Sequence, residues 1–458
     1  MSREIEEIRA RIARASRRLS RDVDRLLEFT RVDERETTQP VREPVREPDP
    51  VRPEPVDPPP SGWDGQIPRW AEIPRFPAPP DEYISVLPTE DPNLVARAYF
   101  ERNPDRSAVR LRIRGINPNQ IRAGGKYGIH REGRPVSVFL EGNDPDAEVQ
   151  GIEVDSYGGT FVENLYVDDL AVRKRAGTKS PVEDRTASGN WWFRKFRPRQ
   201  NVTEAVQGTN YNGAKWGMKP SDGVEQLVVV DSPRVIDPVL REYPKWWEHY
   251  CYLTGCRKYY FSKTDLSGGN RTGFQSNTPR AGDWPWIAPE VDVVRDCLIE
   301  VGLEWNHNDG GSAITRWEQA LGGNSWISHN TIKTRYGGIS IAHQPPNAAQ
   351  YDQYPTPHNL ADDEGYTQQG YTFIINNSIW ITEGTRNAIS ISSCRGAWIE
   401  GNSIRHDGGN GTPIVVDGGF AIKNSAPRCD PATIHINQPG ITVGTYQDGS
   451  YVPHPAYR

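Results

Sequence analysis

The chain has 458 residues, a formal net charge of −6 at pH 7 and 35% hydrophobic residues, and its mean hydropathy is −0.71. This length allows two or three domains, and the low apolar content disfavours one deep globular core. No apolar run is long enough to cross a membrane and the first residues are charged, so we expect no membrane insertion and no signal peptide. The negative net charge gives no reason to expect a nucleic-acid partner.

Residues 1–36 are predicted to form an oligomerisation or attachment helix. The apolar residues on the a and d positions of its heptad repeat are Ile5, Ile8, Ile12, Ala15, Leu19 and Leu26. A helix this short is only marginally stable alone in water. We therefore expect it to have a partner, and two partners are equally favoured: copies of itself in a trimeric coiled coil, or a different protein.

Residues 37–80 are predicted to form an extended linker. The proline-rich stretches are Val41-Arg-Glu-Pro44, Val45-Arg-Glu-Pro48 and Pro58-Pro-Pro60. This composition favours polyproline II, which acts as a semi-rigid spacer, and a disordered tether is the alternative. Trp63, Trp70 and Phe76 lie among these prolines and are candidates to pin the linker to a surface.

A seven-residue phrase recurs in the second half of the chain. Its copies are Trp326-Ile-Ser-His-Asn330-Thr-Ile332, Phe373-Ile-Ile-Asn-Asn377-Ser-Ile379 and Trp398-Ile-Glu-Gly-Asn402-Ser-Ile404. Each copy is followed by a second short alternating run, such as Ile389-Ser-Ile391. Self-similarity of this kind is typical of stacked repeats, and period-two runs bounded by Gly, Asn and Asp predict short β-strands.

An asparagine stands at one fixed place in each copy of the phrase, as Asn330, Asn377 and Asn402. Asn tolerates the left-handed backbone region, so we expect it to form a tight corner between two strands. Stacked Asn side chains also form hydrogen-bonded ladders, and such a ladder is expected along the repeat.

Weaker strand patterns extend the repeat in both directions. The coil of strands is expected to span residues 107–437 and to be followed by a C-terminal tail at 438–458. A small adaptor at 81–106 precedes it, with a short helix expected near residues 91–100.

The repeat resembles the right-handed parallel β-helix of the pectate-lyase-like superfamily. An oligomerising helix, a stiff spacer and a C-terminal β-helix together resemble a bacteriophage tailspike or a related virion fibre. The resemblance covers the arrangement of the whole chain and no signature motif. It implies a mainly β fold, a homotrimer, a location on the tail or capsid surface, and contacts of residues 1–80 with other virion proteins. It also implies receptor binding to bacterial surface polysaccharide during host attachment.

Charged residues on consecutive repeats are candidates for catalysis. The set is Glu300, Glu304, Asp309, Arg316, Glu318, Arg335, Glu383 and Asp407. Glycosidases need two carboxyl groups about 5 Å or 6.5–9.5 Å apart, and neighbouring strands lie about 4.8 Å apart, so residues one or two turns apart meet either need. The residues predicted to be catalytic are Glu300, Glu304, Glu383 and Asp407. A mixed-charge face that protects a sheet from aggregation is the alternative.

Aromatic pairs and one loop are candidates for ligand binding. Adjacent strand residues point to opposite faces, so one ring of each Trp pair is expected to be exposed, and flat rings suit sugars. The longest insertion in the repeat, between Ile341 and Tyr371, adds two histidines. The predicted ligand-binding residues are Trp191, Trp246, Trp284, Trp286, His343 and His358. Burial of the rings under loops or between subunits is the alternative.

The five cysteines, at positions 251, 256, 297, 394 and 429, form no paired metal-binding motif. Buried free thiols are therefore predicted, and we expect no metal and no other cofactor.

Three functions remain open at this point. The first is a virion receptor-binding spike, with or without depolymerase activity. The second is a structural virion protein, such as a capsid decoration or head fibre, whose β-helix projects outward. The third is a free polysaccharide lyase or glycoside hydrolase, which the expected absence of a signal peptide disfavours. The linker and helix favour attachment to a larger body, so the spike is preferred.

Overall fold

The computed structural model describes part of the chain in detail. The described residues are 71–155, 160–175, 177–186, 189–199, 216–220, 224–233, 249–254, 256–267, 272–277, 291–301, 311–317, 324–342, 371–383, 387–391, 396–407, 414–416, 434–437, 443–447 and 450–453. The chain divides into two units, Met1–Pro58 and Pro59–Arg458, and every described residue lies in the second. The predicted N-terminal helix, with Ile5, Ile8, Ile12, Leu19 and Leu26, lies outside the described residues.

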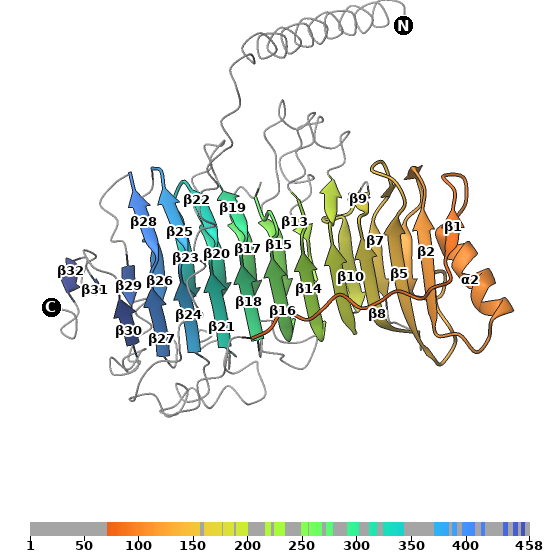
Figure 1. Ribbon diagram of the computed structural model, residues 1–458, viewed down its shortest axis with the longest axis horizontal. Helices are drawn as coiled ribbons and strands as arrows, with labels where there is room; N and C mark the ends of the chain where they lie inside the picture. The colour runs from red at the N-terminus through yellow and green to blue at the C-terminus, as the bar shows by residue number, and fades with distance from the viewer. Residues whose placement is uncertain are drawn as a thin grey trace, which may run out of the picture. The chain divides into compact units, whose positions relative to one another are not determined.

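Twelve strands form one long sheet (Figure 1). In spatial order they are β1 (Ile84–Val86), β2 (Ala108–Ile113), β5 (Pro135–Gly142), β8 (Phe161–Asp168), β11 (Asn190–Arg194), β14 (Gln226–Val230), β16 (Lys258–Ser262), β18 (Val291–Arg295), β21 (Asn324–Ser328), β24 (Tyr371–Ile375), β27 (Gly396–Glu400) and β30 (Ile434–Asn437). All neighbouring strands of this sheet run parallel.

A second sheet has nine strands. In spatial order they are β13 (Trp216–Met218), β15 (His249–Thr254), β17 (Thr272–Asn277), β20 (Ser312–Trp317), β23 (Gly337–Ala342), β26 (Ile389–Ile391), β29 (Ile414–Val416), β31 (Val443–Gln447) and β32 (Ser450–Pro453). Among the described strand pairs of this sheet, only β31 and β32 run antiparallel.

The described strands also form three smaller parallel sheets. One contains β4 (Ile121–Gly124), β7 (Ile152–Asp155) and β10 (Val182–Thr186). Another contains β3 (Ile116–Asn117), β6 (Glu148–Val149), β9 (Ala171–Arg173) and β12 (Arg197–Arg199). The last, named here the C-terminal four-stranded sheet, contains β19 (Leu298–Val301), β22 (Thr331–Thr334), β25 (Ser378–Ile381) and β28 (Ser403–His406).

The chain visits these sheets in rotation. After β18 in the long sheet it forms β19 in the C-terminal four-stranded sheet and β20 in the nine-stranded sheet, and it then returns to the long sheet as β21. Because β21 pairs in parallel with β18, each such turn lies on the one before it. The fold is therefore mainly β with parallel sheets, as the repeat predicted, and it is compatible with a parallel β-helix. We refer to this stack of turns as the coil.

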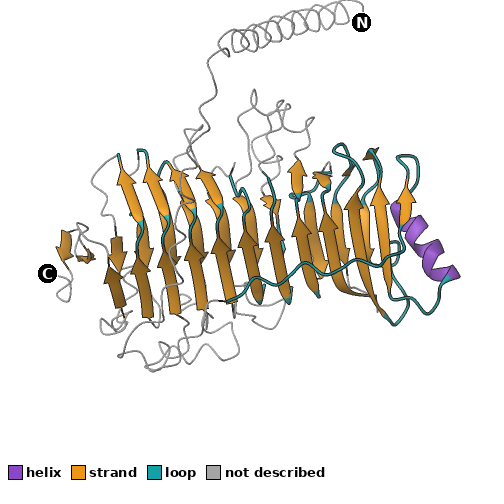
Figure 2. Cartoon of the chain, viewed as in Figure 1, coloured by secondary structure: helices purple, strands orange, loops and turns teal. Residues whose placement is uncertain are grey.

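A short helix closes the N-terminal end of the described coil (Figure 2). The helix α2 spans Pro92–Arg102, close to where the adaptor helix was expected. Asp91 caps it by accepting a hydrogen bond from the Asn93 backbone N–H at 2.8 Å, and Ala96 and Phe100 are buried against the core. The long sheet begins with β1 and the nine-stranded sheet continues to β32, so the strands extend beyond the expected 107–437 at both ends.

Ladders of identical residues fill the inside of the coil. Ile299, Ile332 and Ile379 stand in register on the C-terminal four-stranded sheet and are at most 1% exposed. On the nine-stranded sheet the equivalent ladder is Ile314, Ile339, Ile389 and Ile414. Each buried isoleucine stabilises the fold by about 1.5–3 kcal/mol relative to exposure, so the alternation in the sequence specifies which face of each strand lies inside.

At the corner after each long-sheet strand, the residue in the left-handed conformation is not the one that was expected. The left-handed residue is the one before the repeated asparagine: His329 (φ 56°), Asn376 (φ 53°) and Gly401 (φ 64°). Earlier turns place Asp169, Lys195, Asp231, Lys263 and Asp296 in the same conformation. The prediction that Asn330, Asn377 and Asn402 themselves take up the left-handed turn is therefore wrong, because the preceding residue turns the chain and leaves the asparagine facing inward.

The asparagine ladder is confirmed. The Asn377 Oδ1 accepts hydrogen bonds from the Asn330 backbone N–H at 3.1 Å and from the Asn330 Nδ2 at 2.9 Å. Asn402 Oδ1 accepts the equivalent pair from Asn377 at 3.0 and 2.9 Å. Each Nδ2 also donates to a strand carbonyl, for example Asn377 to Ile327 at 2.9 Å. The ladder thus satisfies the backbone at a buried corner where water is excluded.

Three of the predicted buried thiols lie in the described residues. Cys251, Cys256 and Cys297 are free and buried, as predicted, whereas Cys394 and Cys429 lie outside the described residues. Cys297 occupies the corner position equivalent to Asn330, and its backbone N–H donates to Asn330 Oδ1 at 2.9 Å. Burial raises the pKa of the Cys297 thiol to about 12, so it is a packing residue and not a nucleophile at neutral pH.

An ion pair lies inside the coil. Asp292 on β18 and Arg316 on β20 are 2% exposed, and Arg316 Nε is 2.9 Å from Asp292 Oδ2. Tyr259 donates its hydroxyl to Asp292 Oδ2 at 3.0 Å, and the Ser325 hydroxyl donates to Oδ1. Burial raises the pKa of the Asp292 carboxyl, while the Arg316 charge and the two hydroxyls oppose that shift. The expectation that Arg316 belongs to an exposed charged face is wrong, because its strand position faces inward.

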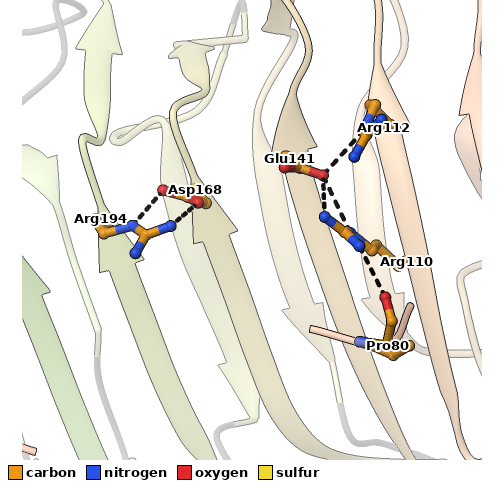
Figure 3. A network of polar contacts seen from close by, with 6 residues as sticks. All are labelled: Pro80, Arg110, Arg112, Glu141, Asp168 and Arg194. Atoms are coloured by element: carbon orange, nitrogen blue, oxygen red, sulfur yellow. Dashed lines mark hydrogen bonds and ion pairs between the residues drawn. The ribbon is translucent and has the colours of Figure 1, made fainter. Parts of the chain in front are cut away.

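Residues 71–80 form an extended strap along the outer face of the long sheet (Figures 1 and 2). The Phe76 ring lies 6.1 Å from the Tyr166 ring and 6.5 Å from the Trp192 ring. The Pro80 carbonyl accepts a hydrogen bond from Arg110 Nη1 at 2.8 Å, and Glu141 holds Arg110 (Figure 3). Phe76 therefore pins this part of the linker to the coil.

Candidate functional site

The outer face of the C-terminal four-stranded sheet carries a row of large polar and aromatic side chains. Each residue follows an isoleucine that is buried or, for Ile404, partly buried against the core, so strand alternation turns it outward. The row in register is Glu300, Lys333, Trp380 and Arg405. Successive members stand about 4.8 Å apart along the coil, which is close enough for neighbouring side chains to touch.

Trp380 lies between two cations. Lys333 Nζ is 4.4 Å from the centre of the Trp380 ring, and Arg405 Cζ is 4.5 Å from it. A cation over an aromatic face contributes about 0.5–1 kcal/mol at an exposed site. The two contacts place a cationic group on each neighbouring strand against the ring.

Asp407 completes the arrangement around the tryptophan. Its Oδ2 accepts a hydrogen bond from Trp380 Nε1 at 2.7 Å, and its Oδ1 accepts one from Arg405 Nε at 2.8 Å. These two bonds hold the pKa of Asp407 below its usual range, with that from Arg405 contributing most. Asp407 is therefore ionised at neutral pH and is suited to accept hydrogen bonds, not to donate a proton.

A second ion pair lies on the strand extensions beside this group. Arg335 Nε is 2.7 Å from Glu383 Oε2, and the Glu383 side chain is 61% exposed. The backbone fixes both residues, because the Arg335 N–H donates to the Val301 carbonyl and the Glu383 N–H to that of Arg335. We name the group formed by Lys333, Arg335, Trp380, Glu383, Arg405 and Asp407 the Trp380 patch.

The chemistry of the Trp380 patch is that of recognition. Arginine presents a planar fork of donors that matches carboxylates and paired hydroxyl oxygens. Carboxylates accept hydrogen bonds from hydroxyl groups, and an aromatic ring supplies an apolar surface. Sugars offer hydroxyl groups around an apolar ring face, so this combination of groups suits a carbohydrate chain lying along the sheet.

The predicted catalytic residues differ in where the structure places them. Glu383 and Asp407 belong to the Trp380 patch, and Glu300 lies in the same outward row on β19. Glu304 lies outside the described residues. The structure thus brings three of the four predicted acids to one face, but it places two of them in ion pairs with arginines.

Sequence reasoning missed the aromatic centre of the patch. Trp380 is not among the predicted ligand-binding residues, yet it stands on the outside of the coil and is half-buried. The signal was present in Ile379-Trp-Ile381, because two inward isoleucines force the residue between them outward. The same alternation marks Lys333 and Arg405 as outward residues.

The predicted ligand-binding residues are not gathered at this patch. Trp191 is fully buried in the inward row with Leu165 and Leu227, so the prediction that its ring is available to a surface ligand is wrong. Its neighbour Trp192 faces outward and is covered by Phe76. The remaining predicted residues, Trp246, Trp284, Trp286, His343 and His358, lie outside the described residues.

Comparisons with known proteins do not identify a relative of this chain. It matches no protein family, no curated protein and no solved structure. In the described part of the chain, no helix is long and apolar enough to cross a membrane. The same residues contain no group of three or more His, Cys, Asp or Glu side chains placed to hold a metal ion.

Proposed function

We propose that this protein is a bacteriophage virion spike whose right-handed parallel β-helix binds bacterial surface polysaccharide through the Trp380 patch. The observation that carries the proposal is the outward Lys333–Trp380–Arg405 row with Asp407 bonded to its centre. A straight face of stacked turns suits a polymer, because each further turn adds a polar or aromatic side chain along the length of the bound chain. The spike would be a homotrimer attached to other virion proteins through residues 1–80.

Binding without cleavage is the form of this function that the patch favours. A general acid for glycoside hydrolysis needs a pKa raised toward neutrality, whereas the Arg405 and Trp380 hydrogen bonds lower the pKa of Asp407. Glu383 is paired with Arg335 at 2.7 Å. Both carboxylates are thus better placed to orient donors around a ligand than to transfer protons.

Replacing Trp380 by alanine is expected to weaken binding to bacterial cells by about tenfold or more. Loss of a central aromatic residue in a binding site typically costs over 1 kcal/mol, and each 1.4 kcal/mol is tenfold in affinity. The variant also frees the Lys333 and Arg405 side chains from the ring. The measurement is retention of labelled full-length protein on a panel of capsulated bacteria, compared with strains that lack the capsule.

Tyr127→Ala is the matched control, because Tyr127 is 67% exposed and lies outside the patch. It should bind as well as the wild-type protein. If Trp380→Ala also binds like the wild-type protein, the patch is not the binding site. If the wild-type protein binds none of the strains, a structural virion protein without a glycan ligand becomes the better interpretation.

A further inference from the structure

A row of side chains crosses the outer face of the long sheet from strand to strand. In register it consists of Phe139, Tyr166, Trp192, Val228, Tyr260, Val293, Trp326, Phe373 and Trp398. Seven of these nine residues are aromatic. We name this row the aromatic track.

Rings on the track stack along the coil at both of its ends. The Phe139 and Tyr166 ring centres are 4.0 Å apart, and those of Trp326 and Phe373 are 5.5 Å apart with nearly parallel planes. Trp326 is 3% exposed and Phe373 is 5% exposed. Side chains on the outside of a sheet reach such low exposure only when another segment lies over them.

The strap supplies that cover at the N-terminal end of the track. Phe76 lies against Tyr166 and Trp192, and Arg194 Cζ is 4.5 Å from the Phe76 ring centre. Asp168 holds Arg194 by a hydrogen bond at 2.7 Å (Figure 3). From Pro80 toward residue 71 the strap crosses successive strands in the direction of β16 and β18 (Figure 1). It therefore extends along the long sheet from its N-terminal strands toward β18.

The spacing of aromatic residues in the strap sequence matches the spacing of the strands. Trp70 precedes Phe76 by six residues, which in an extended proline-rich chain span about 19 Å at 3.1 Å per residue. Four strand steps of about 4.8 Å also cover about 19 Å. Phe76 contacts Tyr166 on β8 as well as Trp192 on β11, and β21, which carries Trp326, lies four steps beyond β11 and five steps beyond β8.

We propose that Trp70 docks on the Trp326–Phe373 stack, so that residues 70–80 form one continuous strap along the aromatic track of their own chain. An aromatic-lined groove is a favourable surface for an extended proline-containing segment, because such a segment loses little conformational entropy on binding. The consequence is that the linker leaves the coil near β21, the ninth of the twelve strands of the long sheet. A mechanical force applied to the N-terminal segment is then distributed over several turns of the coil and does not act on β1 alone.

A photo-crosslink in the full-length protein tests this contact. A benzophenone amino acid at position 70 should crosslink to β21 or β24 of the same chain, as mapped by mass spectrometry of the digested product. The control places the same amino acid at the exposed position 127, which should give no crosslink to these strands. A crosslink to another copy of the chain, to residues 343–370 or to no part of the protein would overturn the proposal.

Proteolysis gives a second readout that does not depend on the crosslinker. Trypsin cleavage after Arg69 should be at least tenfold faster in Trp70→Ala than in wild-type protein, and Trp63→Ala is the matched control with little change. The unfolding midpoint of the coil should stay the same in both variants. Equal cleavage rates in wild-type and Trp70→Ala protein would contradict docking at this position. Neither readout uses a polysaccharide, so the outcome is independent of the proposed function.

Discussion

Replacing Arg316 by methionine is expected to lower the free energy of unfolding by about 3–5 kcal/mol, because it leaves the buried Asp292 carboxylate without its cation. Both side chains lie inside the coil and are 2% exposed, so water cannot replace the lost partner. The Tyr259 and Ser325 hydroxyls still donate to the carboxylate, but they carry no charge. Urea unfolding of the full-length protein at pH 7 measures the change.

The double variant Asp292→Asn/Arg316→Met is the control for this prediction. It removes both charges and keeps one side-chain oxygen, which accepts from one of the Tyr259 and Ser325 hydroxyls, while the other hydroxyl can rotate to accept from the new amide N–H. Because a buried ion pair contributes little net stability over neutral residues of similar size, the double variant should be more stable than Arg316→Met alone. If the two substitutions destabilise additively, the ion pair is not the source of the effect.

Acidification should partly rescue Arg316→Met. Burial raises the pKa of Asp292 and Arg316 lowers it, so removing Arg316 raises this pKa further. A carboxyl whose folded pKa is raised binds more protons when folded than when unfolded, so its stabilising contribution is present in acid and is lost as pH rises. The stability difference between variant and wild-type protein should therefore shrink between about pH 7 and pH 5. A difference that is constant over this range would contradict the assignment.

Replacing Asn377 by alanine is expected to lower the free energy of unfolding by about 2–4 kcal/mol. The substitution removes the Oδ1 that accepts from the Asn330 backbone N–H and side chain, and the Nδ2 that donates to the Ile327 carbonyl. Each buried polar group left without a partner costs about 1–3 kcal/mol. Asn377 is 1% exposed, so solvent does not compensate without local opening.

Ser378→Ala is the matched control for Asn377→Ala. Ser378 is the next residue in the same phrase and is exposed, so its replacement should change stability by no more than about 0.5 kcal/mol. Thermal or urea unfolding of the three proteins gives the comparison. Equal stability of Asn377→Ala and Ser378→Ala would show that the ladder does not stabilise the coil.

The repetitive part of the fold was predictable from local residue patterns. Three residues such as Ile389-Ser-Ile391 are enough to assign the inward and outward faces of a strand, because successive side chains point to opposite faces and only one face meets the core. The asparagine ladder was also predictable, since a polar residue repeated at a buried position needs identical partners above and below. The exact corner residue was not predictable in this way. Asn376 and Asn377 have similar turn propensities, and only the backbone conformation in the structure shows that Asn376 is the left-handed residue.

The candidate site was only partly predictable. Glu383 and Asp407 were identified as outward acids, but their arginine partners lie 48 residues away and two residues away, respectively. The number of residues in each loop sets which turn lies next to which, and loop length carries no pattern in a single sequence. The inward position of Arg316 was missed for a different reason, because a charged residue within a strand is ordinarily expected to be exposed.

The strap illustrates the limit of composition as a guide. A proline-rich stretch between two patterned segments indicates a spacer, but its composition does not say which surface the segment contacts. Phe76 was one of the three candidate pins, and its ring lies against Tyr166 and Trp192 on the long sheet. The aromatic residue among the prolines indicated that this part of the linker contacts a surface, because it is unfavourable to leave an aromatic ring exposed to water.

The most direct test of the central proposal is to map where a bacterial polysaccharide binds. Purified surface polysaccharides are screened against the full-length protein, and hydrogen–deuterium exchange is then measured with and without a polysaccharide that is retained. The proposal predicts slower exchange in residues 331–336, 378–383 and 403–407, with little change along β2 and β5 of the long sheet. Protection confined to another face of the coil, or no retained polysaccharide in the screen, would contradict it.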